Sequence, residues 1–168
     1  RQRQMCIRDS CVAKGVQPIL VIPPNHLSVT QVMEEKQSPD PWFLAERRAM
    51  AKLVADVNAA HPQVSCVLWD LNIPSPVTSE PYPPRDQPRP MLYWLDPIHF
   101  TPATGDRYAS LILGTGEQDK SLALKVDVNQ PDAYLAEVER LFKDAQGLLK
   151  DEREGIRRVI AAEPPAKP

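Results

Sequence analysis

Residues 16–71 decide the fold: VQPILVI at 16–22, PWFLAERRAMAKLVADVNAA at 41–60 and VSCVLWDL at 64–71. The first and third segments are short, nearly continuous apolar runs, typical of strands buried on both faces of a parallel sheet. The middle segment follows an Asp40-Pro41 helix start, and its core-facing positions recur every three or four residues, at Phe43, Leu44, Arg47, Met50, Ala51, Val54 and Val57. Strand, helix, strand in this order predicts a βαβ unit with parallel strands and a right-handed crossover.

The carboxyl ends of these two strands are the expected functional edge. Ligands of open α/β sheets bind beyond the carboxyl ends of the strands. This rule places residues 23–26 and 72–76 at that edge. Asn25 and His26 are therefore candidate substrate-binding residues, with an exposed loop histidine that has no function as the alternative for His26.

The rest of the chain predicts a long loop and further helices. Residues 72–92 contain seven prolines, which exclude a regular helix or a central strand and indicate a long surface loop. A helix is expected from Thr101-Pro102 to about Leu113, and a short strand at Leu122 to Val128. Pro131 opens one last long helix, whose apolar positions keep a single phase as far as Val159. This helix packs on its own domain, or else presents a coiled-coil surface to a partner.

The segment YWLDPIHFTPATGDRYASLIL, residues 93–113, contains the candidate catalytic residues. Asp96 and His99 lie three residues apart, with Pro97 fixing the backbone between them. A carboxylate that binds one ring nitrogen of a histidine leaves the other nitrogen to accept a proton, as a base serving a hydroxyl nucleophile must. Asp96 would orient the ring and His99 would accept and return the proton. In the alternative, Asp96 begins a helix and His99 is a satisfied buried histidine.

The order of these segments resembles the C-terminal half of SGNH/GDSL hydrolases. In the last block, D-x-x-H-hydrophobe-x-Pro-x-x-Gly, the matching residues are Asp96, His99, Phe100, Pro102 and Gly105. The block is most similar to the membrane-anchored, cell-envelope branch related to alginate O-acetylation and D-alanylation proteins. The resemblance covers about residues 12 to 150. It implies a three-layer, flavodoxin-like α/β fold with a parallel sheet, truncated at its N-terminus and followed by a helical extension.

The resemblance implies a serine acyl-ester hydrolase or O-acyltransferase that acts on acetylated carbohydrate in the periplasm or cell envelope, with no cofactor. The family's Gly-Asp-Ser block and its oxyanion-hole residues would precede the strand at Val16. Arg8-Asp9-Ser10 does not supply that serine, because five residues separate Ser10 from Val16 and a parallel crossover needs at least about ten. This chain alone is therefore expected to be inactive or nearly so.

The chain divides into four parts. Residues 1–10 are expected to be a non-native or disordered segment, residues 11–128 the hydrolase part, residues 129–160 the helical extension and residues 161–168 a disordered tail.

Two rival functions remain. A non-catalytic domain of this fold would bind polysaccharide or a partner, and an interaction protein would self-associate through Leu135 to Val159.

Composition and charge limit the kinds of partner and ligand that this chain is expected to bind. The net charge is -2 and the basic residues are scattered, which argues against nucleic acid. No apolar run reaches the roughly 18 residues of a membrane span, so any anchor belongs to the missing N-terminal part. The three cysteines lack metal-ligand spacing, and Cys66 is expected to be a free, partly buried thiol in an apolar strand. No further ligand accompanies His26, Asp96 and His99, so no metal site is expected.

Overall fold

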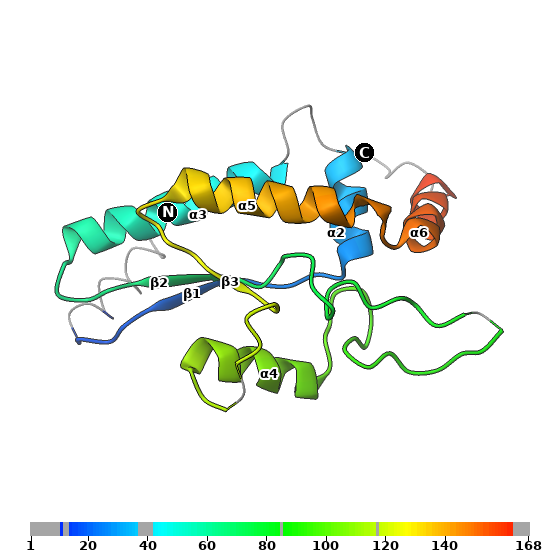
Figure 1. Cartoon of the computed structure of the whole chain (residues 1–168), viewed down its shortest axis with the longest axis horizontal. Coiled ribbons are helices and arrows are strands. Elements are labelled where there is room, and N and C mark those ends of the chain that lie inside the picture. The colour runs from blue at the N-terminus through cyan, green and yellow to red at the C-terminus, as the bar shows by residue number, and fades with distance from the viewer. Residues whose placement is uncertain (1–10, 12–13, 37–41, 85, 117, 163–168) are drawn as a thin grey trace, which may run out of the picture.

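The structure is a computed structural model that describes residues 11, 14–36, 42–84, 86–116 and 118–162. It is mixed α/β, with a small three-stranded sheet and five helices in this part of the chain (Figure 1). The strands are β1 (Ile19–Ile22), β2 (Val67–Asp70) and β3 (Leu124–Lys125). The helices are α2 (Leu27–Lys36), α3 (Trp42–Ala60), α4 (Pro102–Leu113), α5 (Pro131–Asp144) and α6 (Lys150–Ala162). The α/β class is thus confirmed.

The sheet has the order β1-β2-β3 and is mixed. β1 and β2 are parallel, with Ile19 opposite Val67 and Ile22 opposite Asp70, which confirms the parallel pair. β3 runs antiparallel to β2, so the expectation of an all-parallel sheet is wrong. A short apolar stretch carries no information about its direction. That direction is set by the path of the chain between α4 and α5.

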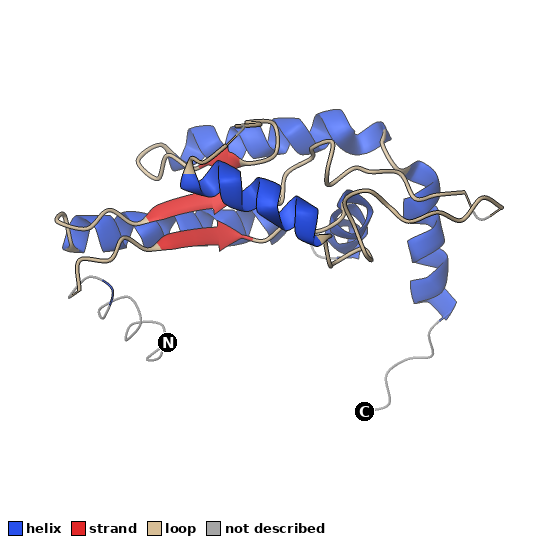
Figure 2. Cartoon of the chain, turned by 90° about the horizontal axis from the view of Figure 1, so that it is seen from below, coloured by secondary structure: helices blue, strands red, loops and turns tan. Residues whose placement is uncertain are grey.

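The helices cover the sheet in layers. α3 and α5 lie on one face and α4 lies on the other (Figures 1 and 2). The first face carries the larger core, which includes Val54, Leu68 and Val138, and the second core joins Trp69 to Tyr108 and Leu111 of α4.

The face of β1 opposite α3 is only partly covered. Within β1 only Ile22 is buried, whereas Ile19 is 41% and Val21 36% exposed. The core beneath α4 is built from β2 and later residues and includes none from β1. The expectation that the first strand is buried on both faces is therefore wrong.

Two helical features differ from the expectation. α2 begins directly after His26, whose carbonyl accepts the N–H of Val29 at 3.0 Å, and its buried face includes Leu27 and Val32. No helix was expected at these residues. The expected single last helix is also divided, because Leu149 adopts a left-handed φ of 55° between α5 and α6.

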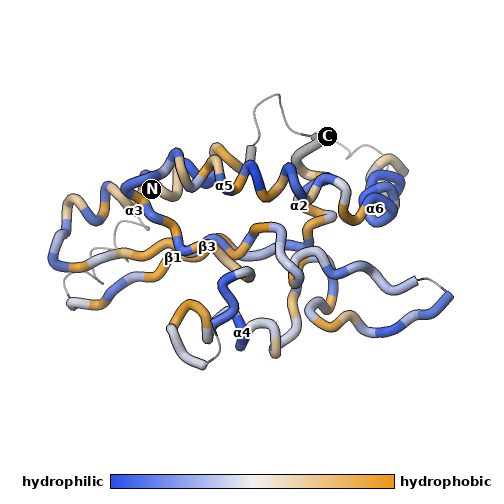
Figure 3. Tube along the Cα trace, in the orientation of Figure 1, coloured by the Kyte–Doolittle hydropathy of each residue, from blue (hydrophilic) through white to orange (hydrophobic). Residues whose placement is uncertain are grey.

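The division of the last helix changes its direction. After the 3₁₀ turn Ala145–Gly147, the chain enters α6, which packs against α2 at one end of the molecule and is mostly hydrophilic (Figure 3). α6 extends to Ala162, two residues into the expected tail. The remainder of that tail and residues 1–10 lie outside the described residues.

The described part of the proline-rich segment 72–92 contains no helix or strand, as predicted. It is not a surface loop throughout, because Ile73, Val77 and Thr78 are buried. The Thr78 hydroxyl donates to the carbonyl of Ile73 at 2.6 Å, and the N–H of Leu27 donates to the carbonyl of Thr78 at 2.7 Å. The first half of the segment is therefore fixed against the start of α2.

Candidate active site

Asp96 and His99 are in direct contact. The Nδ1 atom of His99 lies 2.7 Å from Oδ2 of Asp96. The side chain of His99 is 72% exposed and that of Asp96 is 49% exposed. Among the described residues, no hydrogen-bond partner contacts Nε2 of His99. The expected pairing is thus present, while the alternative of a buried histidine is wrong. Nε2 of the His99 ring is therefore accessible to a group that approaches from solvent.

The Asp96–His99 pair lies at the tip of a tight hairpin formed by residues 93–101. Its two sides are joined by an isolated bridge between Trp94 and Phe100. The N–H of Leu95 donates to the carbonyl of His99 at 2.7 Å, and the N–H of Thr101 donates to the carbonyl of Tyr93 at 2.8 Å. Backbone hydrogen bonds within this short stretch therefore close the hairpin.

α4 starts where the hairpin ends. Thr101 is its N-cap, with its hydroxyl accepting the N–H of Thr104 at 3.4 Å, and Pro102 occupies the first turn, as predicted. A Cβ atom at Gly105 would lie only 3.1 Å from the ring of Phe100. Glycine at this position thus lets the aromatic residue after His99 pack closely on the helix.

The two oxygens of Asp96 have different partners. Oδ1 accepts the N–H groups of Ile98 and His99, both at 2.8 Å, and this closes the turn. Oδ2 is left for the imidazole. The N–H of Ile98, the His99 ring and the N–H of His99 together hold the pKa of Asp96 below its ordinary value. The carboxylate is therefore charged at neutral pH and suited to orient the ring.

The turn lies at the expected edge of the sheet. The N–H of His26, just beyond β1, donates to the carbonyl of Pro97 at 3.0 Å. Beside it, the N–H of Asn25 donates to Oδ1 of Asn72, just beyond β2, at 3.2 Å. The segments after β1 and β2 thus meet, as the parallel arrangement predicted, and the Asp96–His99 pair is attached to them.

The two candidate substrate-binding residues have unlike surroundings. Asn25 is half-buried, and its N–H is used by Asn72. His26 is fully buried, so the reading of an exposed loop histidine is wrong. Its ring nitrogens contact the Ser28 hydroxyl at 2.8 Å and the Glu80 carbonyl at 2.7 Å. The His26 side chain therefore offers no atom to a ligand in this arrangement.

A buried ion pair behind the sheet edge was missed by the sequence analysis. Arg47 of α3 lies 2.7 Å from Asp70 at the end of β2, with exposures of 1% and 0%. The Tyr134 hydroxyl donates to Asp70 at 2.7 Å, and Arg47 also donates to the carbonyl of Asn72 at 2.5 Å. Burial and the adjacent Asp70 carboxylate raise the pKa of Tyr134 far above its ordinary value, so this hydroxyl remains a donor.

Two signals in the sequence point to this cluster. Arg47 occupies a core-facing position of an amphipathic helix, and Asp70 ends an apolar strand. A charge on a buried face needs a partner of opposite sign. The cluster fixes Asn72 and so supports the sheet edge, but its polar atoms are turned inward and are not available to a substrate.

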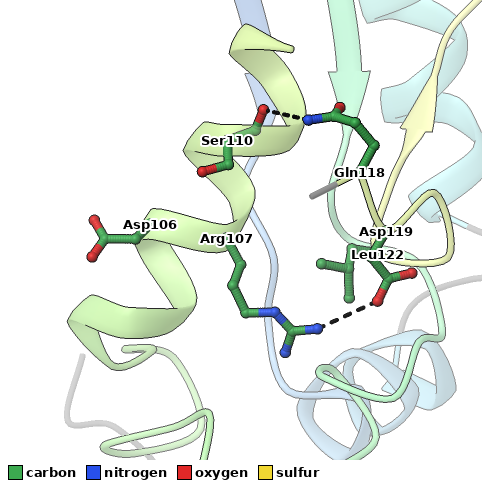
Figure 4. A pocket seen from close by; sticks show the side chains of 6 residues that line it. All are labelled: Asp106, Arg107, Ser110, Gln118, Asp119 and Leu122. Carbon is green, nitrogen blue, oxygen red and sulfur yellow. Dashed lines mark hydrogen bonds and ion pairs between the residues drawn. The ribbon is translucent and has the colours of Figure 1, made fainter. Parts of the chain in front are cut away.

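A cavity of about 470 Å³ lies elsewhere, between α4 and the chain that follows it (Figure 4). It is lined by Asp106, Arg107, Ser110, Gln118, Asp119 and Leu122. Arg107 points toward Asp119, 3.3 Å away, while Asp106 points away from both (Figure 4). The lining is mostly polar and includes no residue of the Asp96–His99 turn, so the cavity and the pair are separate features.

Within the described ranges, no three His, Cys, Asp or Glu side chains gather as a metal site requires. None of the described helices has the length and apolarity needed to cross a bilayer. Cys66 is free, as predicted, and more deeply buried than expected, and burial raises the pKa of its thiol. Ser10 lies outside the described residues.

Searches against protein-family models, curated proteins and solved structures found no match.

Proposed function

We propose that this chain is the C-terminal part of a serine acyl-ester hydrolase or O-acyltransferase of the SGNH type. The observation that supports this most directly is the Asp96–His99 pair, with its 2.7 Å contact through Nδ1 and an open Nε2. A charged carboxylate at Nδ1 selects the tautomer in which Nε2 accepts a proton. That is the state a general base needs.

In the proposed reaction, His99 accepts the proton of a serine hydroxyl as that oxygen attacks the ester carbonyl. The tetrahedral intermediate then collapses, and His99 returns the proton to the departing alcohol, which leaves an acyl-serine. Water completes hydrolysis of this acyl-enzyme, whereas a second alcohol completes transfer. Throughout, Asp96 holds the ring and stabilises the imidazolium. The serine is supplied by residues preceding this chain.

The proposed substrate is an acetylated carbohydrate, and the proposed location is the periplasm or cell envelope. Both follow from the resemblance of residues 93–112 to the cell-envelope branch of the family. The position of the Asp96–His99 turn at the sheet edge, where α/β proteins bind ligands, is compatible with this role.

The test compares a longer form of the protein, extended upstream, with the 168-residue chain, using p-nitrophenyl acetate and an acetylated xylo-oligosaccharide. We expect ester hydrolysis by the longer form, almost none by the shorter chain, and a loss of at least about 10³-fold in kcat with His99→Ala. His61→Ala is the matched control, because His61 lies in the turn after α3 and should leave the rate unchanged.

Full activity of the longer form carrying His99→Ala would refute the proposal. Full activity of the 168-residue chain, unaffected by Ser10→Ala, would refute the part that assigns the serine to an upstream segment. Binding of the oligosaccharide without hydrolysis, and independent of His99, would instead identify a non-catalytic carbohydrate-binding domain.

A further inference from the structure

His26 is a completely buried titratable side chain close to the Asp96–His99 turn. It is 0% exposed, and its ring stacks on Tyr82 with centroids 4.6 Å apart. The rings of His26 and Trp94 meet in a T-shaped arrangement, with centroids 5.7 Å apart. These two aromatic residues come from the proline-rich segment and from the hairpin that carries Asp96 and His99. One buried ring therefore contacts both segments.

The polar contacts of His26 determine its protonation. The Glu80 carbonyl can only accept, so Nε2 of His26 carries the hydrogen. Nδ1 then accepts the Ser28 hydroxyl, and the Ser28 oxygen lies 3.3 Å from the hydroxyl of Tyr82. Burial lowers the pKa of His26, which is opposed by the Glu80 carbonyl and by the charges of Glu152 and Glu80. The ring is therefore neutral and fixed in one orientation.

Two routes connect His26 to the Asp96–His99 turn. In the first, the backbone N–H of His26 donates to the carbonyl of Pro97, which lies between Asp96 and His99. In the second, the ring holds Glu80 through its carbonyl.

The side chain of Glu80 completes the second route at the base of the hairpin. Its carboxylate accepts the N–H of Leu92 at 2.6 Å and the N–H of Tyr93 at 2.8 Å. The tip and the base of the hairpin are thus both connected to His26, which lies between β1 and α2.

We infer that His26 is a positioning residue, which sets the geometry of the Asp96–His99 pair through Glu80 and Pro97 without touching the substrate. This inference rests on the proposed function for its catalytic meaning. It differs from a purely structural role because it predicts a change in the titration of Asp96 while the protein stays folded.

The experiment measures the pKa of Asp96 by carboxyl ¹³C NMR in the 168-residue chain, with Asp96→Asn used to assign the signal. His26→Phe keeps an aromatic ring against Tyr82 but removes both polar contacts of the side chain. Because the route through Glu80 is then lost, while the backbone bond from residue 26 to Pro97 remains, we expect the pKa of Asp96 to rise part of the way toward its ordinary value. His26→Gln, whose amide can donate to the Glu80 carbonyl, should restore part of the lowering.

The control is Val138→Ala in α5, which opens a cavity in the core on the other face of the sheet. It should destabilise the fold without altering the titration of Asp96. An unchanged Asp96 pKa in folded His26→Phe, or an equal rise in Val138→Ala, would overturn the inference.

A second variant covers the case in which His26→Phe does not fold. Glu80→Ala removes the acceptor at the base of the hairpin and should also raise the pKa of Asp96, although loss of the Glu80 charge alone acts in the opposite direction. Glu80→Gln removes the same charge but keeps an amide oxygen that can accept these N–H groups, so an equal Asp96 pKa in Glu80→Ala and Glu80→Gln would overturn the route through Glu80. A changed Asp96 titration together with unaltered esterase activity in His99→Ala would support the positioning role and refute the proposed esterase.

Discussion

Replacing Arg47 by methionine should be among the most destabilising single changes in this protein. The substitution keeps a long apolar stem in α3 but removes a guanidinium that lies 2.7 Å from Asp70 and contacts the carbonyl of Asn72. Asp70 would keep the Tyr134 hydroxyl and the N–H of Asn72, yet remain a buried charge without a counter-ion. Removing one partner of a buried ion pair costs about 3–5 kcal/mol. A domain of this size has about 5–15 kcal/mol in total.

Arg48→Met is the matched control, because it makes the same substitution one position along the same helix. Arg48 forms an ion pair with Asp132 at 3.1 Å, but the two side chains are 62% and 88% exposed. An exposed pair of this kind contributes less than about 1 kcal/mol. Helix propensity changes equally in both variants, so the difference between them isolates burial of the ion pair.

The assay is urea unfolding followed by circular dichroism, with linear extrapolation to water. We expect Arg47→Met to lower the free energy of unfolding by about 3–5 kcal/mol and Arg48→Met by less than about 1 kcal/mol. Equal losses in the two variants would refute the reasoning, because burial would then have no effect on the value of the pair.

Two further predictions concern the hairpin and the first strand. Asp96 has a lowered pKa when folded, so its contribution to stability is present above its unfolded pKa of about 3.9 and is lost as pH falls through the folded pKa. The stability difference between the wild type and Asp96→Asn, measured by urea unfolding from pH 7 downward, should therefore shrink in acid, and a difference that is constant with pH would contradict this. Val21 is 36% exposed on the partly covered face of β1, so Val21→Lys should reduce self-association in sedimentation velocity without lowering the unfolding midpoint. A wild-type chain that is monomeric at all concentrations tested would count against this.

The parts of the fold that were predicted correctly are encoded locally. The start of α4 depends on Thr101 and Pro102, which are adjacent in the chain. The contact of Asp96 with His99 spans three residues, and the turn is closed by N–H groups within the same span. Spacing and residue type are therefore enough to predict that these groups can meet.

The features that were missed depend on long-range contacts. Tyr134 reaches Asp70 across 64 positions, and His26 reaches the Glu80 carbonyl across 54. The burial of His26 could not be read from its neighbours, because the residues that enclose it come from a proline-rich segment that looked like a surface loop. The direction of β3 likewise depends on the chain path and not on its apolar residues.

The exposure of the His99 ring constrains how the proposed chemistry can operate. At 72% exposure, water screens the attraction between the imidazolium and Asp96, which is then far weaker than in an enclosed site. Catalytic electrostatics gains most of its strength when water is excluded. In the proposed esterase, the upstream segment that brings the serine must therefore also cover the His99 ring. His26 and Glu80 would hold the Asp96–His99 turn in position for this segment.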